Sequence, residues 1–138
     1  MRIASLCRRR AFAVESLTIG RTEAPGVSRV TLFVATDPAG ARRLAANLAK
    51  LVDVLEVEDV SDLPIVVRDL AMIKVAAPPD ARAGIMQLVQ VFRARVVDVA
   101  ADSLVIETTG TDDKVDGLLQ VLRPFGVIEV ARSGRLAM

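Results

Sequence analysis

The apolar residues in the second half of the chain alternate between strand spacing and helix spacing. Residues 66–77 (VVRDLAMIKVAA) are rich in aliphatic and β-branched side chains, and Pro78-Pro79 ends this run because proline cannot continue a strand. From Asp80 onward the apolar side chains recur at helical spacing, at Ile85, Leu88, Val89 and Phe92. The pattern predicts a strand followed by a helix.

Two further strands and a second helix are predicted after this helix. Residues 94–100 and 104–109 are β-rich runs that flank a tight Ala-Asp-Ser turn. Thr111 is a favourable N-cap, and apolar residues follow it at helical spacing. Residues 126–132 (GVIEVAR) predict a last strand. The predicted order of the second half is therefore β-α-β-β-α-β.

The first half repeats this order without its first strand. The predicted elements are a helix over residues 2–10, strands over 12–20 and 28–35, a helix over 38–50, and a strand over 52–60. Asp37-Pro38 marks the start of the second helix, with an N-cap followed by proline in the first helical position. The sequences VLEV and VIEV follow corresponding helices in the two halves. This repetition indicates an internal duplication.

The duplication predicts an α+β protein made of two ferredoxin-like β-α-β-β-α-β domains with antiparallel sheets, the first lacking its initial strand. The N-terminal domain is predicted over residues 1–60, a linker rich in Ser, Asp and Pro over 61–65, and the C-terminal domain over 66–138. Domains of this size bury little surface when alone. We therefore expect a dimer.

Composition and charge narrow the class of function. The chain has 138 residues, a net charge of +1, one cysteine and no histidine, so it lacks the commonest general base and transition-metal ligand. It has no uninterrupted apolar run near the roughly 18 residues needed to cross a bilayer. A near-neutral charge does not favour nucleic acid. We expect a cytoplasmic, non-catalytic protein that binds no cofactor, metal, nucleic acid or membrane.

Four short motifs occur in an order that points to one family: ESLT, KLVDVLEV, FRARVVDV and ARSG. With them, the chain from about Arg2 to Gly134 resembles the small regulatory subunit of acetolactate synthase (acetohydroxyacid synthase). The resemblance implies an N-terminal ACT domain and a C-terminal ACT-like domain. It also implies that the chain binds and activates the large thiamine-diphosphate-dependent catalytic subunit. That enzyme would then respond to branched-chain amino acids, chiefly valine, in valine, leucine and isoleucine biosynthesis.

The resemblance places an amino-acid effector site at Ala13, Val14 and Glu15, in the strand that begins FAVESL. Members of the family usually carry asparagine in the place of Ala13, and a strand and glycine-containing loop usually precede their first helix. Backbone N–H groups at such a helix start bind anionic groups. The resemblance therefore implies an effector site that is incomplete in this sequence.

A second predicted site is a contact segment for the catalytic subunit or for a second copy of the chain. We place it at the motif KLVDVLEV, on residues Leu51, Val52, Asp53 and Val54. The resemblance also implies a homodimer formed through the ACT domains.

The missing first strand has a physical consequence, because in this topology it lies between the third and fourth strands. Its absence leaves buried backbone groups without partners, at a cost of about 1–3 kcal/mol each. Three explanations stay open: a start codon that lies further upstream, a strand supplied by another chain, or a rearranged first domain. We favour the upstream start.

Two other functions are compatible with the predicted fold. The chain could be a free-standing ACT-type module that senses amino acids and regulates a different enzyme. It could also be an RNA-binding domain on the same scaffold, but such domains stack bases on sheet aromatics. The candidate strands over 28–35 and 103–110 carry a single Phe between them. The sequence therefore favours the regulatory subunit.

Overall fold

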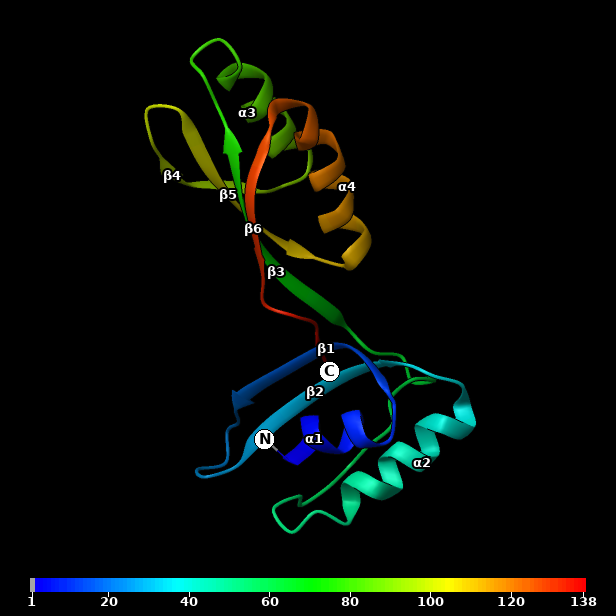
Figure 1. Cartoon of the computed structure of the whole chain (residues 1–138). Coiled ribbons are helices and arrows are strands. Elements are labelled where there is room, and N and C mark those ends of the chain that lie inside the picture. Colours follow the sequence, from blue (N-terminus) through cyan, green and yellow to red (C-terminus); the bar gives the residue numbers. More distant parts are fainter. Residues whose placement is uncertain (1) are drawn as a thin grey trace. The chain divides into compact units, whose positions relative to one another are not determined.

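A computed structural model describes residues 2–138 of the chain (Figure 1). The chain divides into two compact units. One consists of Met1–Val66 with Ala137–Met138 and is called the N-terminal unit below, and the other, Val67–Leu136, is called the C-terminal unit. Both contain antiparallel strands and helices, in agreement with the predicted pair of ferredoxin-like, ACT-type folds.

The C-terminal unit has the β-α-β-β-α-β order that the sequence predicts. Its elements are β3 (Val67–Ala76), α3 (Arg82–Val91), β4 (Arg95–Val99), β5 (Ser103–Gly110), α4 (Asp112–Leu122), the short 3-10 helix η1 (Arg123–Phe125) and β6 (Val127–Arg132). The strands lie in the order β4-β5-β3-β6, and every pairing among them is antiparallel. The short β7 (Leu136–Ala137) also pairs with β3. As a result, β3 lies at the centre of the sheet between β5 and β6.

The core of the C-terminal unit lies between this sheet and the helices α3 and α4 (Figure 1). Buried and exposed residues alternate along β3, so Ala71, Ile73 and Val75 face the core. The buried members of the core cluster are Ile73, Val75, Ala77, Ile85, Val89, Leu104, Ile106, Leu118 and Leu122. Thr111 caps α4 as predicted, since its side chain accepts a hydrogen bond from the backbone N–H of Lys114.

The N-terminal unit is smaller in regular structure and in core. Its elements are α1 (Arg2–Arg9), β1 (Ala13–Arg21), β2 (Ser28–Ala35) and α2 (Pro38–Ala49). The two strands form an antiparallel hairpin. Asp37 caps α2 as predicted, because its Oδ1 accepts a 2.6 Å hydrogen bond from the Gly40 N–H. The core cluster has three buried members among the described residues, Leu6, Cys7 and Leu44.

The prediction of a closing strand over residues 52–60 was wrong. These residues have no strand structure, and Leu55 is 81% exposed although the segment has the composition of a strand. The C-terminal unit supplies the reason, because among the described strands β6, which follows α4 there, pairs with the central strand β3 alone. Among residues 2–66 no strand corresponds to β3, so residues 52–60 have no strand beside which to form a ladder.

Within residues 2–138, no helix is both long enough and apolar enough to cross a membrane.

Candidate functional site

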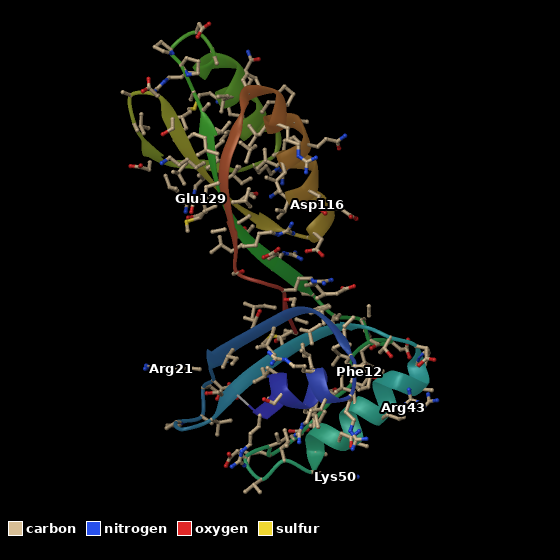
Figure 2. The ribbon with its side chains drawn as sticks, viewed as in Figure 1. Phe12, Arg21, Arg43, Lys50, Asp116 and Glu129 are labelled. Atoms are coloured by element: carbon tan, nitrogen blue, oxygen red, sulfur yellow. The ribbon has the colours of Figure 1, made fainter. Side chains whose placement is uncertain are left out.

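Two hollows of small-molecule size in the N-terminal unit share one lining residue, Phe12, which is labelled in Figure 2. The first, here called the polar hollow, measures about 340 Å³ and is lined by Arg10, Ala11, Phe12, Ala35, Thr36, Arg43 and Asn47. The second, the apolar hollow, measures about 300 Å³ and is lined by Ala4, Cys7, Arg8, Phe12, Val14 and Leu17. Both hollows therefore depend on the turn that joins α1 to β1.

A hydrogen-bonded turn at the end of α1 fixes the position of Phe12. The Phe12 N–H donates to the Cys7 carbonyl at 2.9 Å, and the Ala11 N–H donates to the Arg8 carbonyl at 3.2 Å. Ala11 has a φ of 57°, so the pair of bonds forms a Schellman motif with alanine in the left-handed position. The motif brings the Phe12 ring back against the core cluster that contains Cys7. Sequence reasoning missed this turn, because glycine is the usual signal for it.

The apolar hollow can hold an aliphatic group next to a cation. Phe12, Val14 and Leu17 provide apolar walls, and the side chain of Arg8 lines the same hollow. Cys7 also lines it, and burial raises the pKa of its thiol, so that the thiol stays protonated and unreactive at neutral pH. An aliphatic side chain with an attached carboxylate matches this combination of walls.

The structure separates the three residues of the predicted effector site. Val14 lines the apolar hollow and is 42% exposed. Ala13 and Glu15 are also exposed on β1, but neither lines either hollow. Ala13 precedes Val14 on the strand and so points to the opposite face, whereas Glu15 lies at a bulge, since the ladder with β2 shifts register between Val14 and Ser16. One of the three predicted residues thus lies at a hollow.

The polar hollow brings together residues that sequence reasoning did not connect. Arg10 follows α1, whereas Arg43 and Asn47 lie one turn apart on α2. The Asn47 side-chain amide donates to the Arg43 carbonyl at 2.9 Å, which holds the asparagine against its own helix. The i, i+4 spacing of Arg43 and Asn47 could have indicated a shared helix face, but nothing in the pattern pointed to Arg10. Two exposed arginines, Arg10 and Arg43, therefore line one hollow.

The predicted contact segment after α2 has an inner and an outer side. Leu51 and Val54 are half-buried, and Leu51 packs against the core cluster of the N-terminal unit. Val52 and Leu55 are 86% and 81% exposed, and Asp53 is exposed between them. Large apolar side chains that project so far from a surface are candidates for contact with another protein.

The C-terminal unit contains a cluster of charged groups around Arg132. The guanidinium of Arg132 donates to Asp69 at 2.9 Å, to Asp116 at 2.8 Å and to Asp112 at 3.2 Å, so it joins β6 to β3 and α4. Arg135 forms a second ion pair with Asp112 at 3.3 Å. Desolvation lowers the pKa of Arg132, but the hydrogen bonds to Asp116 and Asp69 outweigh it and the pKa is raised overall.

This cluster is built for stability, because its carboxylates are already paired with arginines. Asp69 is only 3% exposed, and the Ser133 hydroxyl donates a further hydrogen bond to it at 3.3 Å. Across the part of the chain that the structure describes, no group of three or more Asp, Glu, Cys and His side chains is arranged to hold a metal ion.

The antiparallel sheets, the helices packed on them and the duplicated order of elements define a protein with two ACT-type domains. The comparisons with known proteins agree with this class. Residues 68–138 match the family described as the small subunit of acetolactate synthase, and residues 1–56 match the small subunit-like ACT domain of acetohydroxyacid synthase (AHAS).

Individual members of the same family are similar to this chain over nearly its whole length. The probable acetolactate synthase small subunit of Archaeoglobus fulgidus is 42% identical over 137 residues, which are 99% of this chain and 86% of the relative. The acetolactate synthase small subunit of Bacillus subtilis is also 42% identical, over 99% of this chain and 80% of its own length. The crystal structure of the acetolactate synthase small subunit from Thermotoga maritima superimposes with a TM-score of 0.91 and 35% identity, covering 99% of this chain and 86% of that one. The chain belongs to the family of acetolactate synthase small subunits.

Proposed function

We propose that this chain is the regulatory subunit of an acetolactate synthase. It binds the large, thiamine-diphosphate-dependent catalytic subunit, raises its activity and takes no part in bond making itself. The observation that carries the proposal is the family match over 99% of the chain, at 42% identity to small subunits. Thiamine diphosphate would belong to the partner, and we place the pair in the cytoplasm, in the biosynthesis of valine, leucine and isoleucine.

The experiment that tests this proposal is reconstitution of the two subunits. The purified chain is titrated into the catalytic subunit of the same organism while acetolactate production is measured. We expect saturable stimulation and co-elution of the two proteins. A lack of both binding and stimulation would contradict the proposal.

The exposed apolar side chains Val52 and Leu55 are proposed to contact the catalytic subunit. Val52→Asp combined with Leu55→Asp places two charges on this contact, and a buried unpaired charge is costly. We expect the small-subunit concentration for half-maximal stimulation to rise by about tenfold or more, which corresponds to about 1.4 kcal/mol of lost binding. The measurement is the same titration, with circular dichroism as a check on folding.

Val91→Asp is the matched control for this contact. Val91 is 75% exposed on α3, so the change adds a charge to an equally accessible apolar position elsewhere. The Val91→Asp variant should stimulate the catalytic subunit with the same half-maximal concentration as the unchanged chain. Equal half-maximal concentrations for the double variant and the unchanged chain would exclude this segment from the contact.

We further propose that a branched-chain amino acid, valine above all, binds at the apolar hollow. The aliphatic side chain would contact Phe12, Val14 and Leu17, and the carboxylate would approach Arg8. The second part of the site would come from a second copy of the chain, in a homodimer formed through the ACT domains. Sedimentation of the purified chain tests the dimer directly.

Val14→Asp tests the effector site. A carboxylate at this position would repel the carboxylate of the amino acid and disrupt the apolar wall. We expect the valine concentration for half-maximal inhibition of the reconstituted enzyme to rise by about tenfold or more, while stimulation without valine is retained. Ile19→Asp serves as the control, because Ile19 lies on the same strand, is 49% exposed and lines neither hollow. If Val14→Asp and Ile19→Asp raise the half-maximal valine concentration equally, the amino acid does not bind at the apolar hollow.

A second candidate function is a free-standing ACT-type sensor that regulates a different enzyme. The apolar hollow with Arg8 favours it as much as it favours the first function, since the hollow needs no catalytic subunit. Calorimetry of the isolated chain against a panel of amino acids, together with the reconstitution above, separates the two functions. Amino-acid binding without stimulation of the synthase would select the sensor.

A further inference from the structure

The polar hollow carries positive charge that has no ion-pair partner within residues 2–138. Arg10 and Arg43 line it, and among the described residues that line it none is acidic. Neither arginine side chain forms an ion pair or a hydrogen bond in the part of the chain that the structure describes. Arg132, by contrast, has three carboxylate partners. The charge at the hollow is therefore available to an anion from outside the chain.

Two separate elements bring these arginines to the same hollow. Arg10 directly follows α1, and its N–H donates to the Leu6 carbonyl at 3.0 Å, so its backbone continues the last turn of that helix. Ala11, in the left-handed conformation, then turns the chain toward β1. Arg43 lies inside α2, where helical hydrogen bonds hold its backbone (Figure 2). Since both backbones are fixed, only the two side chains have to be ordered when a ligand binds.

Neutral polar groups of the same hollow can add hydrogen bonds to an anion. The Thr36 hydroxyl has no hydrogen-bond partner within residues 2–138, and it lies against the start of α2. A Cβ on Gly40 would collide with Thr36 Oγ1, so glycine at this position leaves the room that the hydroxyl occupies. The Asn47 amide donates one N–H to the Arg43 carbonyl and retains a second. The carboxylate of Asp37 does not line the hollow and accepts the Gly40 N–H at 2.6 Å.

Size and charge define the class of ligand. A hollow of about 340 Å³ admits a small metabolite. Each guanidinium can pair with an oxyanion through two parallel N–H···O bonds, so Arg10 and Arg43 together match two negative charges. Phe12, Ala11 and Ala35 supply apolar lining for a short carbon skeleton. An anion with one carboxylate would leave one of the two arginines without a partner.

We propose that the polar hollow binds a small, doubly charged oxyanion, either a phosphate monoester or a dicarboxylate. Arg10 and Arg43 neutralise its two charges, and Thr36 and Asn47 donate hydrogen bonds to its oxygens. This site is separate from the apolar hollow, which shares Phe12 with it but holds the proposed branched-chain amino acid. The proposal does not rest on the proposed function.

Nuclear magnetic resonance titration of the whole 138-residue chain tests the proposal at pH 8 and constant ionic strength. Inorganic phosphate represents the phosphate monoester, malonate represents the dicarboxylate, and acetate is the singly charged control. We expect saturable shifts of the backbone amides of Ala11, Thr36 and Asn47 with at least one of the two dianions, and binding of acetate that is about tenfold weaker or more. The dianion that binds more tightly identifies the source of the oxyanion. Absence of saturable shifts with both dianions, or acetate that binds as tightly, would overturn the proposal.

A double variant and a matched control separate a built site from diffuse charge. Arg10→Gln combined with Arg43→Gln should raise the dissociation constant of the tighter dianion by about tenfold or more. Arg9→Gln combined with Arg42→Gln removes the same charge from neighbouring exposed positions that do not line the hollow. This control should change the dissociation constant by about twofold or less, because exposed charges outside the hollow are screened by salt. Equal weakening by the two double variants would mean that the anion only senses the overall charge, and the site would be rejected.

Thr36→Ala gives a second, smaller change that keeps the test decisive if the arginine variant fails to fold by circular dichroism. Thr36 is exposed, and its replacement removes the hydroxyl without removing charge. We expect the dissociation constant of the dianion to rise by about threefold or more, because a hydrogen bond to a charged group is lost. An unchanged dissociation constant would count against the site. None of these measurements involves a synthase, so failure here is distinct from failure of the proposed function.

Discussion

Arg132→Leu is expected to lower the free energy of unfolding of the C-terminal unit by about 3–5 kcal/mol. The side chain of Asp69 is 3% exposed, and Arg132 is its ion-pair partner at 2.9 Å. Without the guanidinium, Asp69 would be a buried carboxylate whose remaining side-chain partner is the Ser133 hydroxyl, 3.3 Å away. A buried charge that loses its partner keeps the whole cost of its desolvation.

Urea unfolding followed by far-ultraviolet circular dichroism measures this loss, because the chain has no Trp or Tyr for fluorescence. Hydrogen exchange of the backbone amides in β3 and β5 shows whether the loss of unfolding free energy lies in the C-terminal unit. Arg95→Leu is the control: Arg95 pairs with Glu107 at 2.8 Å, but its side chain is 75% exposed, so about 0–1 kcal/mol is expected. Combining Arg132→Leu with Asp69→Leu should recover much of the stability, because no buried charge then lacks a partner, and Asp116, which also loses Arg132, is 63% exposed. If Arg132→Leu and Arg95→Leu lower the free energy of unfolding by similar amounts, Arg132 does not stabilise the unit through the buried carboxylate of Asp69.

Leu118→Ala is expected to destabilise the same unit by about 2–5 kcal/mol. Leu118 lies on α4 with no exposed surface, in the core cluster that also contains Ile73 and Ile106 on the sheet. Truncation removes buried methyl groups and leaves a cavity, because the central strands are held by ladders on both sides and cannot close on the space.

Val91→Ala provides the comparison for Leu118→Ala. Val91 is 75% exposed on α3, and its replacement should change the free energy of unfolding by about 0.5 kcal/mol or less. The midpoint of urea unfolding should fall for Leu118→Ala without a change in slope. A midpoint equal to that of Val91→Ala would mean that α4 does not contribute to the cooperative core.

The C-terminal unit could be predicted closely, because local signals and tertiary packing agree there. Alternation in β3, the proline pair after it and the Thr111 cap each act within a few residues, and the strand that each ladder needs is present. The start of α2 at Asp37 was predictable for the same reason. Of the residues predicted for the effector site, Val14 lines the apolar hollow; the polar hollow is lined by Arg10, Arg43 and Asn47, which sequence reasoning did not connect. Their meeting depends on a turn with alanine in a left-handed conformation.

The sequence by itself determined the class of fold, the duplication and the family, since these reside in periodicity, caps and ordered motifs. Only the tertiary structure decided the state of residues 52–60, which have a strand pattern but no partner strand within residues 2–138. It also decided the pairing of Asp69 with Arg132, which lie 63 positions apart in the chain. A helix satisfies its hydrogen bonds within itself, whereas strands and buried ion pairs depend on partners that are distant in sequence. That difference in the range of the interactions separates what could be predicted from what could not.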